Sequence, residues 1–190
     1  MISEVFRKSF HVFFGIIFLL LIYFLGTEIS LLIITAIFII GLIVSLLHKN
    51  GIKIPIFENV IFLVERDHEK HLPGKAALMF FLAAIIVLYL FKENPEIVLA
   101  ALSVQIFADT AAAIIGKRFG KHTIVSKDHY TKTLEGTLAC FVVAVIILFI
   151  FFPIEIALIC AVIATIIEFA PINDNLTIPV VLAFVLKLLL

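Results

Sequence analysis

Charged side chains are scarce in this 190-residue chain. Asp, Glu, Lys and Arg make up 15% of it, whereas hydrophobic residues make up 64% and the mean hydropathy is +1.27. A soluble domain has no need of so much apolar surface, and a bilayer core admits only helices and closed barrels. The apolar runs are continuous rather than alternating, which excludes a membrane barrel. We therefore expect an all-α, polytopic integral membrane protein.

Cysteine is also rare, because the chain has only Cys140 and Cys160, both within apolar runs. This excludes a disulfide framework or a zinc site and favours small core side chains. No cleavage site of small residues follows the first apolar run, so we expect that run to be retained as a span. Without internal repeats or low-complexity segments, residues 1–190 are expected to form a single catalytic domain.

The apolar runs predict about seven transmembrane helices, each close to the roughly 20 residues that a crossing needs. They lie at 9–25, 29–47, 75–91, 96–116, 136–152, 154–169 and 176–190. With the N-terminus in the cytoplasm, twelve of the 14 Lys and Arg residues fall on the cytoplasmic side. This asymmetry follows the positive-inside rule. Because the outer turns are short, we expect the active face to be cytoplasmic.

Residues 52–64 are too short and too polar to span, and their apolar side chains share one helical face. They predict an interfacial helix on the cytoplasmic surface. The charged run at 65–71 is either a solvated loop or the rim of a site.

A carboxylate, Asp109, stands inside the fourth apolar run. An ionisable group at membrane depth costs roughly 2.5 kcal/mol or more and usually serves function. Asp109 is either the partner of a buried Lys or Arg, or a ligand of Mg²⁺, which meets phosphates through one or two carboxylates.

A basic run, Gly116-Lys117-Arg118-Phe119-Gly120-Lys121, follows at once. The glycines permit positive φ and close backbone approach, and the cations would neutralise phosphate oxygens. The run lacks the Walker spacing. Taken alone, it would anchor a helix end on the cytoplasmic side.

The segment from Lys132 to Gly136 opens the next span. Lys132 and Glu135 are three residues apart and would share a helical face, and Thr131 or Thr133 could cap that helix. The segment is either a capped helix start, or a site in which Lys132 binds phosphate and Glu135 serves a metal or acts as the base.

The remaining polar groups fall on the same side of the membrane. Between the last two spans lie Glu168, Asn173, Asp174 and Asn175, without Lys or Arg. They form either a turn and a cap or part of a metal–nucleotide site. At the mouth of the first span lie Arg7, Lys8 and His11, and His11 is either a hydrogen-bonded core residue or catalytic.

These motifs resemble those of the CTP-using membrane transferases, a group that includes CDP-diacylglycerol synthase and the CTP-dependent dolichol and phytol kinases. The resemblance to the whole group rests on Asp109, on the basic run from Gly116 to Lys121 and on the segment Lys132-Thr-Leu-Glu-Gly136. Three further segments are similar to segments of the kinases, namely the start at Arg7-Lys8-x-x-His11, the motif Glu69-x-x-Leu72-Pro73-Gly74 and the ending from Glu168 to Pro179. The synthase ending is absent.

The resemblance implies a CTP-dependent kinase that phosphorylates a dolichol, polyprenol, phytol or geranylgeraniol type of lipid alcohol at the cytoplasmic face. Mg²⁺ would bind Asp109 with Asp174 or Glu168. The base would be Asp174, or else His11. The triphosphate would meet the basic and amide groups, namely Arg7, Lys8, Lys117, Arg118, Gly120, Lys121, Lys132, Asn173 and Asn175.

Two alternatives remain at this stage: a cytidylyltransferase that makes a CDP-lipid, and a membrane transporter. A transporter should carry polar groups at both faces, but here they gather at one. Expected partners are CTP, the lipid and the bilayer of a prokaryotic plasma membrane, with a possible homodimer and no nucleic acid.

Overall fold

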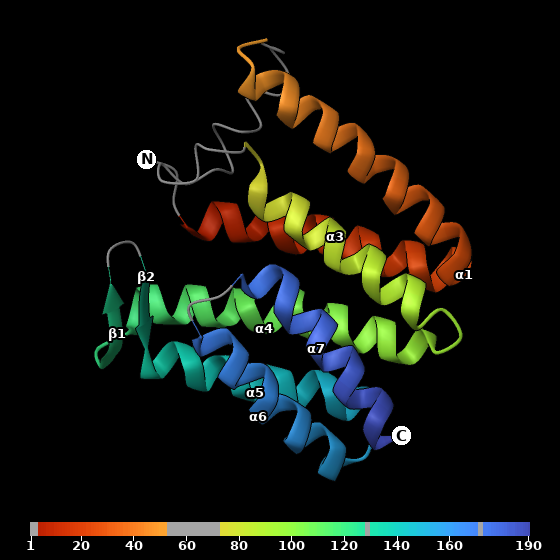
Figure 1. Ribbon diagram of the computed structural model, residues 1–190. Helices are drawn as coiled ribbons and strands as arrows, with labels where there is room; N and C mark the ends of the chain where they lie inside the picture. The colour runs from red at the N-terminus through yellow and green to blue at the C-terminus, as the bar shows by residue number, and fades with distance from the viewer. Residues whose placement is uncertain (1–3, 53–72, 128–129, 171–172) are drawn as a thin grey trace.

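The computed structural model describes residues 4–52, 73–127, 130–170 and 173–190. They are mostly helical (Figure 1). The helices are α1 (Glu4–Lys49), α3 (Lys75–Leu90), α4 (Pro95–Phe119), α5 (Leu134–Phe151), α6 (Ile154–Phe169) and α7 (Asp174–Leu189). Each predicted apolar range coincides with one of these helices to within a few residues, except that α1 contains the first two. Apart from Ile52, the predicted interfacial helix and the charged run at 65–71 lie outside the described residues.

Helix α1 consists of two arms that diverge from Gly26 (Figure 1). Gly26 has φ 77° and ψ 172°, a conformation open essentially only to glycine. The neighbouring Thr27 donates its hydroxyl to the carbonyl of Lys92, 2.8 Å away, which ties this turn to the turn between α3 and α4. Among the described helices, α1, α4 and α5 are long and apolar enough to cross a membrane.

Helix α4 is the centre of the bundle, since it packs against α1, α3, α5 and α7. Its contact with α5 depends on glycine. A Cβ on Gly136 would lie 2.8 Å from the carbonyl oxygen of Ala112 and 3.0 Å from the Cα of Gly116. One on Gly120 would lie 2.2 Å from the carbonyl oxygen of Gly116. The φ of Gly120 is −63°, so the positive φ that a glycine permits is not used there. Gly120 instead leaves room for the side chain of Thr133, which would lie 2.6 Å from a Cβ at that position, whereas Gly116 and Gly136 bring the backbones of α4 and α5 together.

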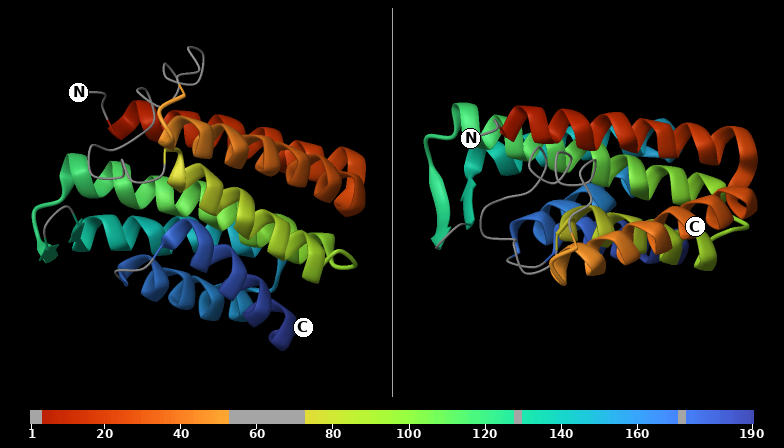
Figure 2. Two further views of the ribbon diagram at one scale, coloured as in Figure 1. Left: turned by 45° about the horizontal axis from the view of Figure 1, so that its top comes forward. Right: turned by 90° about the horizontal axis from the view of Figure 1, so that it is seen from above.

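The basic segment between α4 and α5 contains a hairpin, which the all-α prediction missed. Strand β1 (Thr123–Lys127) pairs antiparallel with β2 (Tyr130–Thr133). Both strands are rich in β-branched residues, which favour extended backbone. The hairpin lies at the same end of the bundle as the start of α1 (Figure 2).

Candidate active site

A cavity of about 1030 Å³ lies at the end of the bundle where α1, α3 and α7 begin and α4 ends. The structure brings most of the predicted site residues to its wall, although they come from five elements. These are Arg7, Lys8, His11, Asp109, Lys117, Gly120, Lys132, Glu168, Asn173, Asp174 and Asn175.

Three predicted residues do not line this cavity. The guanidinium of Arg118 lies over the ring of Phe119, 5.5 Å from its centroid, and Lys121 is exposed. Glu135 Oε1 accepts a hydrogen bond from His122 Nδ1, 2.7 Å away. These three residues therefore lie outside the wall that the other predicted residues share.

The predicted helical face shared by Lys132 and Glu135 is also wrong. Lys132 belongs to β2, because α5 begins only at Leu134. Of the two candidate caps, Thr133 is the one used, and its hydroxyl oxygen accepts the N–H of Gly136 at 3.2 Å. Lys132 therefore lies outside the helix, and its ammonium bonds to Glu168 at the cavity wall.

Asp109 has a buried cationic partner. Its carboxylate, 4% exposed, forms an ion pair with the ammonium of Lys8, which is 7% exposed and comes from the first turns of α1. Two charges removed from water need each other, because a lone buried charge is strongly destabilising. The pair fixes the N-terminal end of α1 against α4 beside the cavity.

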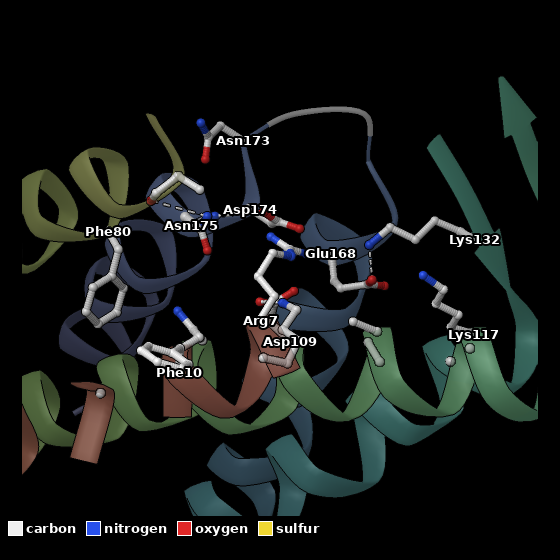
Figure 3. Close-up of a pocket in the computed structure, with 18 of the residues that line it drawn as sticks. Arg7, Phe10, Phe80, Asp109, Lys117, Lys132, Glu168, Asn173, Asp174 and Asn175 are labelled. Atoms are coloured by element: carbon white, nitrogen blue, oxygen red, sulfur yellow. Dashed lines mark hydrogen bonds and ion pairs between the residues drawn. The ribbon is translucent and has the colours of Figure 1, made fainter. Parts of the chain in front are cut away.

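A second pair, in which the carboxylate is buried and the lysine is partly buried, joins the hairpin to α6. The ammonium of Lys132 bonds to a carboxylate oxygen of Glu168, which is 2% exposed (Figure 3). Burial by itself would lower the pKa of Lys132, but the Glu168 carboxylate more than offsets this and raises it above its usual value. The lysine therefore stays charged at the cavity wall.

Asp174, the first residue of α7, faces the same space (Figure 3). Its carboxyl lines the same cavity as the carboxyl of Asp109. Two carboxylates that share one cavity disfavour each other's charged form.

The donor set suits a magnesium ion that arrives with a phosphate. Within the described ranges, no three His, Cys, Asp or Glu side chains converge as a ready-made metal site. Mg²⁺ does not need one, because it commonly takes one or two carboxylates and completes its shell with water and phosphate oxygens. A divalent cation between Asp109 and Asp174 would relieve their repulsion, so these two residues fit it.

Sequence reasoning missed the aromatic half of the cavity and two polar residues. Phe10 and Phe80 lie on the side opposite Lys117 and Lys132 (Figure 3). Phe14, Phe18 and Phe81 complete this wall, and Phe18 stacks on Phe80 with 5.6 Å between ring centroids. The spacing of four between Phe10, Phe14 and Phe18 was a readable signal for one helical face. The missed polar residues are Lys75, at the wall, and Gln105, behind it.

Known proteins resemble this chain along almost its whole length. It is 32% identical over 187 residues to an uncharacterized protein of Methanocaldococcus jannaschii, a match that covers 97% of this chain and 93% of the relative. No solved structure matches it. The family model described as the cytidylyltransferase family matches residues 1–188. The chain therefore belongs to the cytidylyltransferase family.

Proposed function

We propose that this protein is a CTP-dependent kinase that phosphorylates a lipid alcohol of the isoprenoid type at the cytoplasmic face of the membrane. In this proposal the two arms of α1 and the five other helices are seven spans, with the N-terminus in the cytoplasm. The observation that carries the proposal is the single cavity whose wall is charged on one side and aromatic on the other.

The charged side suits a triphosphate. Five cationic side chains reach the wall against three carboxylates, and two of those carboxylates are already paired with lysine. The cations are Arg7, Lys8, Lys75, Lys117 and Lys132. Charge-assisted bonds from lysine and arginine are the usual means of holding phosphate oxygens.

The aromatic side suits the hydrocarbon next to a hydroxyl. Phe14 lines the cavity and is also 51% exposed, as expected at an opening toward lipid. A lipid alcohol could then place its hydroxyl among the polar groups while its chain stays in apolar surroundings.

In the reaction, the alcohol oxygen attacks the γ-phosphorus, the bond from that phosphorus to the bridging oxygen breaks, and CDP leaves. The hydroxyl proton passes to a base. His11 is well placed, because its Nε2 is buried and has no hydrogen-bond partner in the described part of the chain, while its ring is held edge-on against Phe80, 5.3 Å away. Asp174 is the other candidate for the base, in which case Glu168 would be the second carboxylate at the metal. Mg²⁺, held by Asp109 and Asp174, would neutralise charge on the phosphates.

The test is an assay of purified protein with γ-labelled CTP, Mg²⁺ and a panel of polyprenols, phytol, farnesol and diacylglycerol. Label should appear in an organic-extractable lipid phosphate and be lost in Asp109→Asn. Absence of transfer to every alcohol would contradict the kinase.

The family membership favours a second candidate, a CDP-lipid synthase, in which a lipid phosphate attacks the α-phosphorus and pyrophosphate leaves. With α-labelled CTP and a lipid phosphate, this enzyme would put label into the lipid, whereas the kinase would leave the label in the water-soluble nucleotide.

A further inference from the structure

Gln105 is a fully buried amide, 0% exposed, in the centre of α4. It lies one helical turn before Asp109, so both side chains project from the same side of the helix. Burying an amide is costly unless it is hydrogen-bonded. It does not line the cavity, so any contribution to the site must pass through another residue.

That residue is Asn175. Gln105 Nε2 donates to Asn175 Oδ1 at 2.8 Å, and Gln105 Oε1 has no partner among the residues that the structure describes. Asn175 Nδ2 in turn donates to the carbonyl of Ala76, at 3.4 Å. One amide in the first turn of α7 is thus bonded to both α4 and α3.

The same residue also holds the neighbouring carboxylate. The backbone N–H of Asn175 donates to Asp174 Oδ1 at 2.9 Å. A chain of contacts therefore runs from Gln105 through Asn175 to Asp174, while Asp109 lies one turn further along the helix that carries Gln105. The hydrogen bond between Gln105 and Asn175 thus joins the two helices that carry Asp109 and Asp174.

We propose that Gln105 is a positioning residue that fixes the separation of Asp109 and Asp174 through its hydrogen bond to Asn175. This inference rests on the proposed metal role of the two carboxylates. It also changes the role of Asn175, whose amide oxygen and nitrogen are engaged with α4 and α3, so that Asn173 is left as the amide for the nucleotide.

Two variants test the hydrogen bond that the Gln105 amide donates to Asn175. Gln105→Leu removes the amide, and Gln105→Glu keeps its shape but presents an oxygen to Asn175 Oδ1 in place of the N–H. Ser103→Ala is the matched control, because Ser103 is buried in the same helix and does not line the cavity. Both Gln105 variants should raise the Mg²⁺ concentration for half-maximal activity about tenfold or more, with the KM for the lipid unchanged and Ser103→Ala like the wild type.

A measurement without turnover separates this inference from the proposed reaction. Mn²⁺ binding is titrated by electron paramagnetic resonance in the presence of a non-hydrolysable CTP analogue, and should weaken in both Gln105 variants. If the wild type makes a CDP-lipid, the kinase proposal fails, and the Mn²⁺ titration still decides the role of Gln105. The positioning role would be overturned if Gln105→Glu bound Mn²⁺ with the affinity of the wild type. It would also be overturned if the Gln105 variants raised the Mg²⁺ concentration for half-maximal activity and the KM for the lipid by the same factor.

Discussion

At the residue scale, two lysines near the end of α4 differ in position but not in chemistry. Lys117 lines the cavity, whereas Lys121 lies four residues on and is exposed outside it. Lys117→Ala should raise the KM for CTP about tenfold, because a charge-assisted bond contributes about 1.5–3 kcal/mol. Lys121→Ala is the control and should leave that KM nearly unchanged. Equal effects of the two substitutions would argue against the cavity as the nucleotide site.

The ion pair between Lys132 and Glu168 leads to a prediction about stability. Lys132→Met leaves the buried Glu168 carboxylate without its ammonium, and breaking a buried pair on one side costs about 3 kcal/mol or more. Thermal unfolding in detergent should show this loss. The double variant Lys132→Met/Glu168→Gln should recover part of it, since no charge is then left uncompensated. A double variant as unstable as the sum of the two single variants would contradict this explanation.

The sequence predicted which residues carry the chemistry better than it predicted their partners. Asp109 and Glu168 were recognisable as carboxylates in apolar runs. Their lysines were not assignable, because Lys8 and Asp109 are 101 residues apart and Lys132 and Glu168 are 36 apart. Such pairs follow from helix packing. Gln105 gave even less signal, since an uncharged amide in an apolar run does not reveal whether it is bonded.

At the element scale, the crossing of α4 and α5 depends on the absence of a side chain at Gly136. A methyl group there would press on the backbone of Ala112 and Gly116, atoms that cannot move without shifting a helix. Gly136→Ala should therefore lower the free energy of unfolding by about 1–3 kcal/mol. Gly41→Ala, in the second arm of α1, is the control, because its Cβ would meet only Leu78 at 3.7 Å. It should be neutral or slightly stabilising, because alanine is the better helix former, and destabilisation of both variants alike would exclude the crossing as the cause.

The helices were predictable because long apolar runs leave a chain in lipid few alternatives. The hairpin between α4 and α5 was hidden by its polar composition. Five of its nine described strand residues are Lys or Thr, and such a composition first suggests a loop. The run of β-branched residues from Thr123 to Val125 was the available signal. Because the hairpin was missed, Lys132 was predicted to share a helical face with Glu135, whereas its partner is Glu168.

At the scale of the whole molecule, the distribution of positive charge predicts the topology. In a variant with Cys140 and Cys160 replaced by alanine, single cysteines are introduced by Glu93→Cys or Lys121→Cys, both at exposed positions. A membrane-impermeant maleimide should label the first in intact cells and the second only after permeabilisation. The reverse pattern would place the cavity on the outer side and out of reach of cytoplasmic CTP.

The two lysine–carboxylate pairs at the cavity also bear on the order of assembly. Asp109 and Glu168 are each neutralised by a lysine, so a metal that takes a carboxylate frees a cation, and a phosphate that takes a lysine frees an anion. Either ligand alone leaves one member of a lysine–carboxylate pair without an opposite charge. When both bind, the metal takes the carboxylate and the phosphate takes the lysine, so that no charge is left unpaired. By linkage, each then raises the affinity for the other by the same factor. We therefore expect the metal and the nucleotide to enter as one complex, and free magnesium or free nucleotide to compete poorly with it.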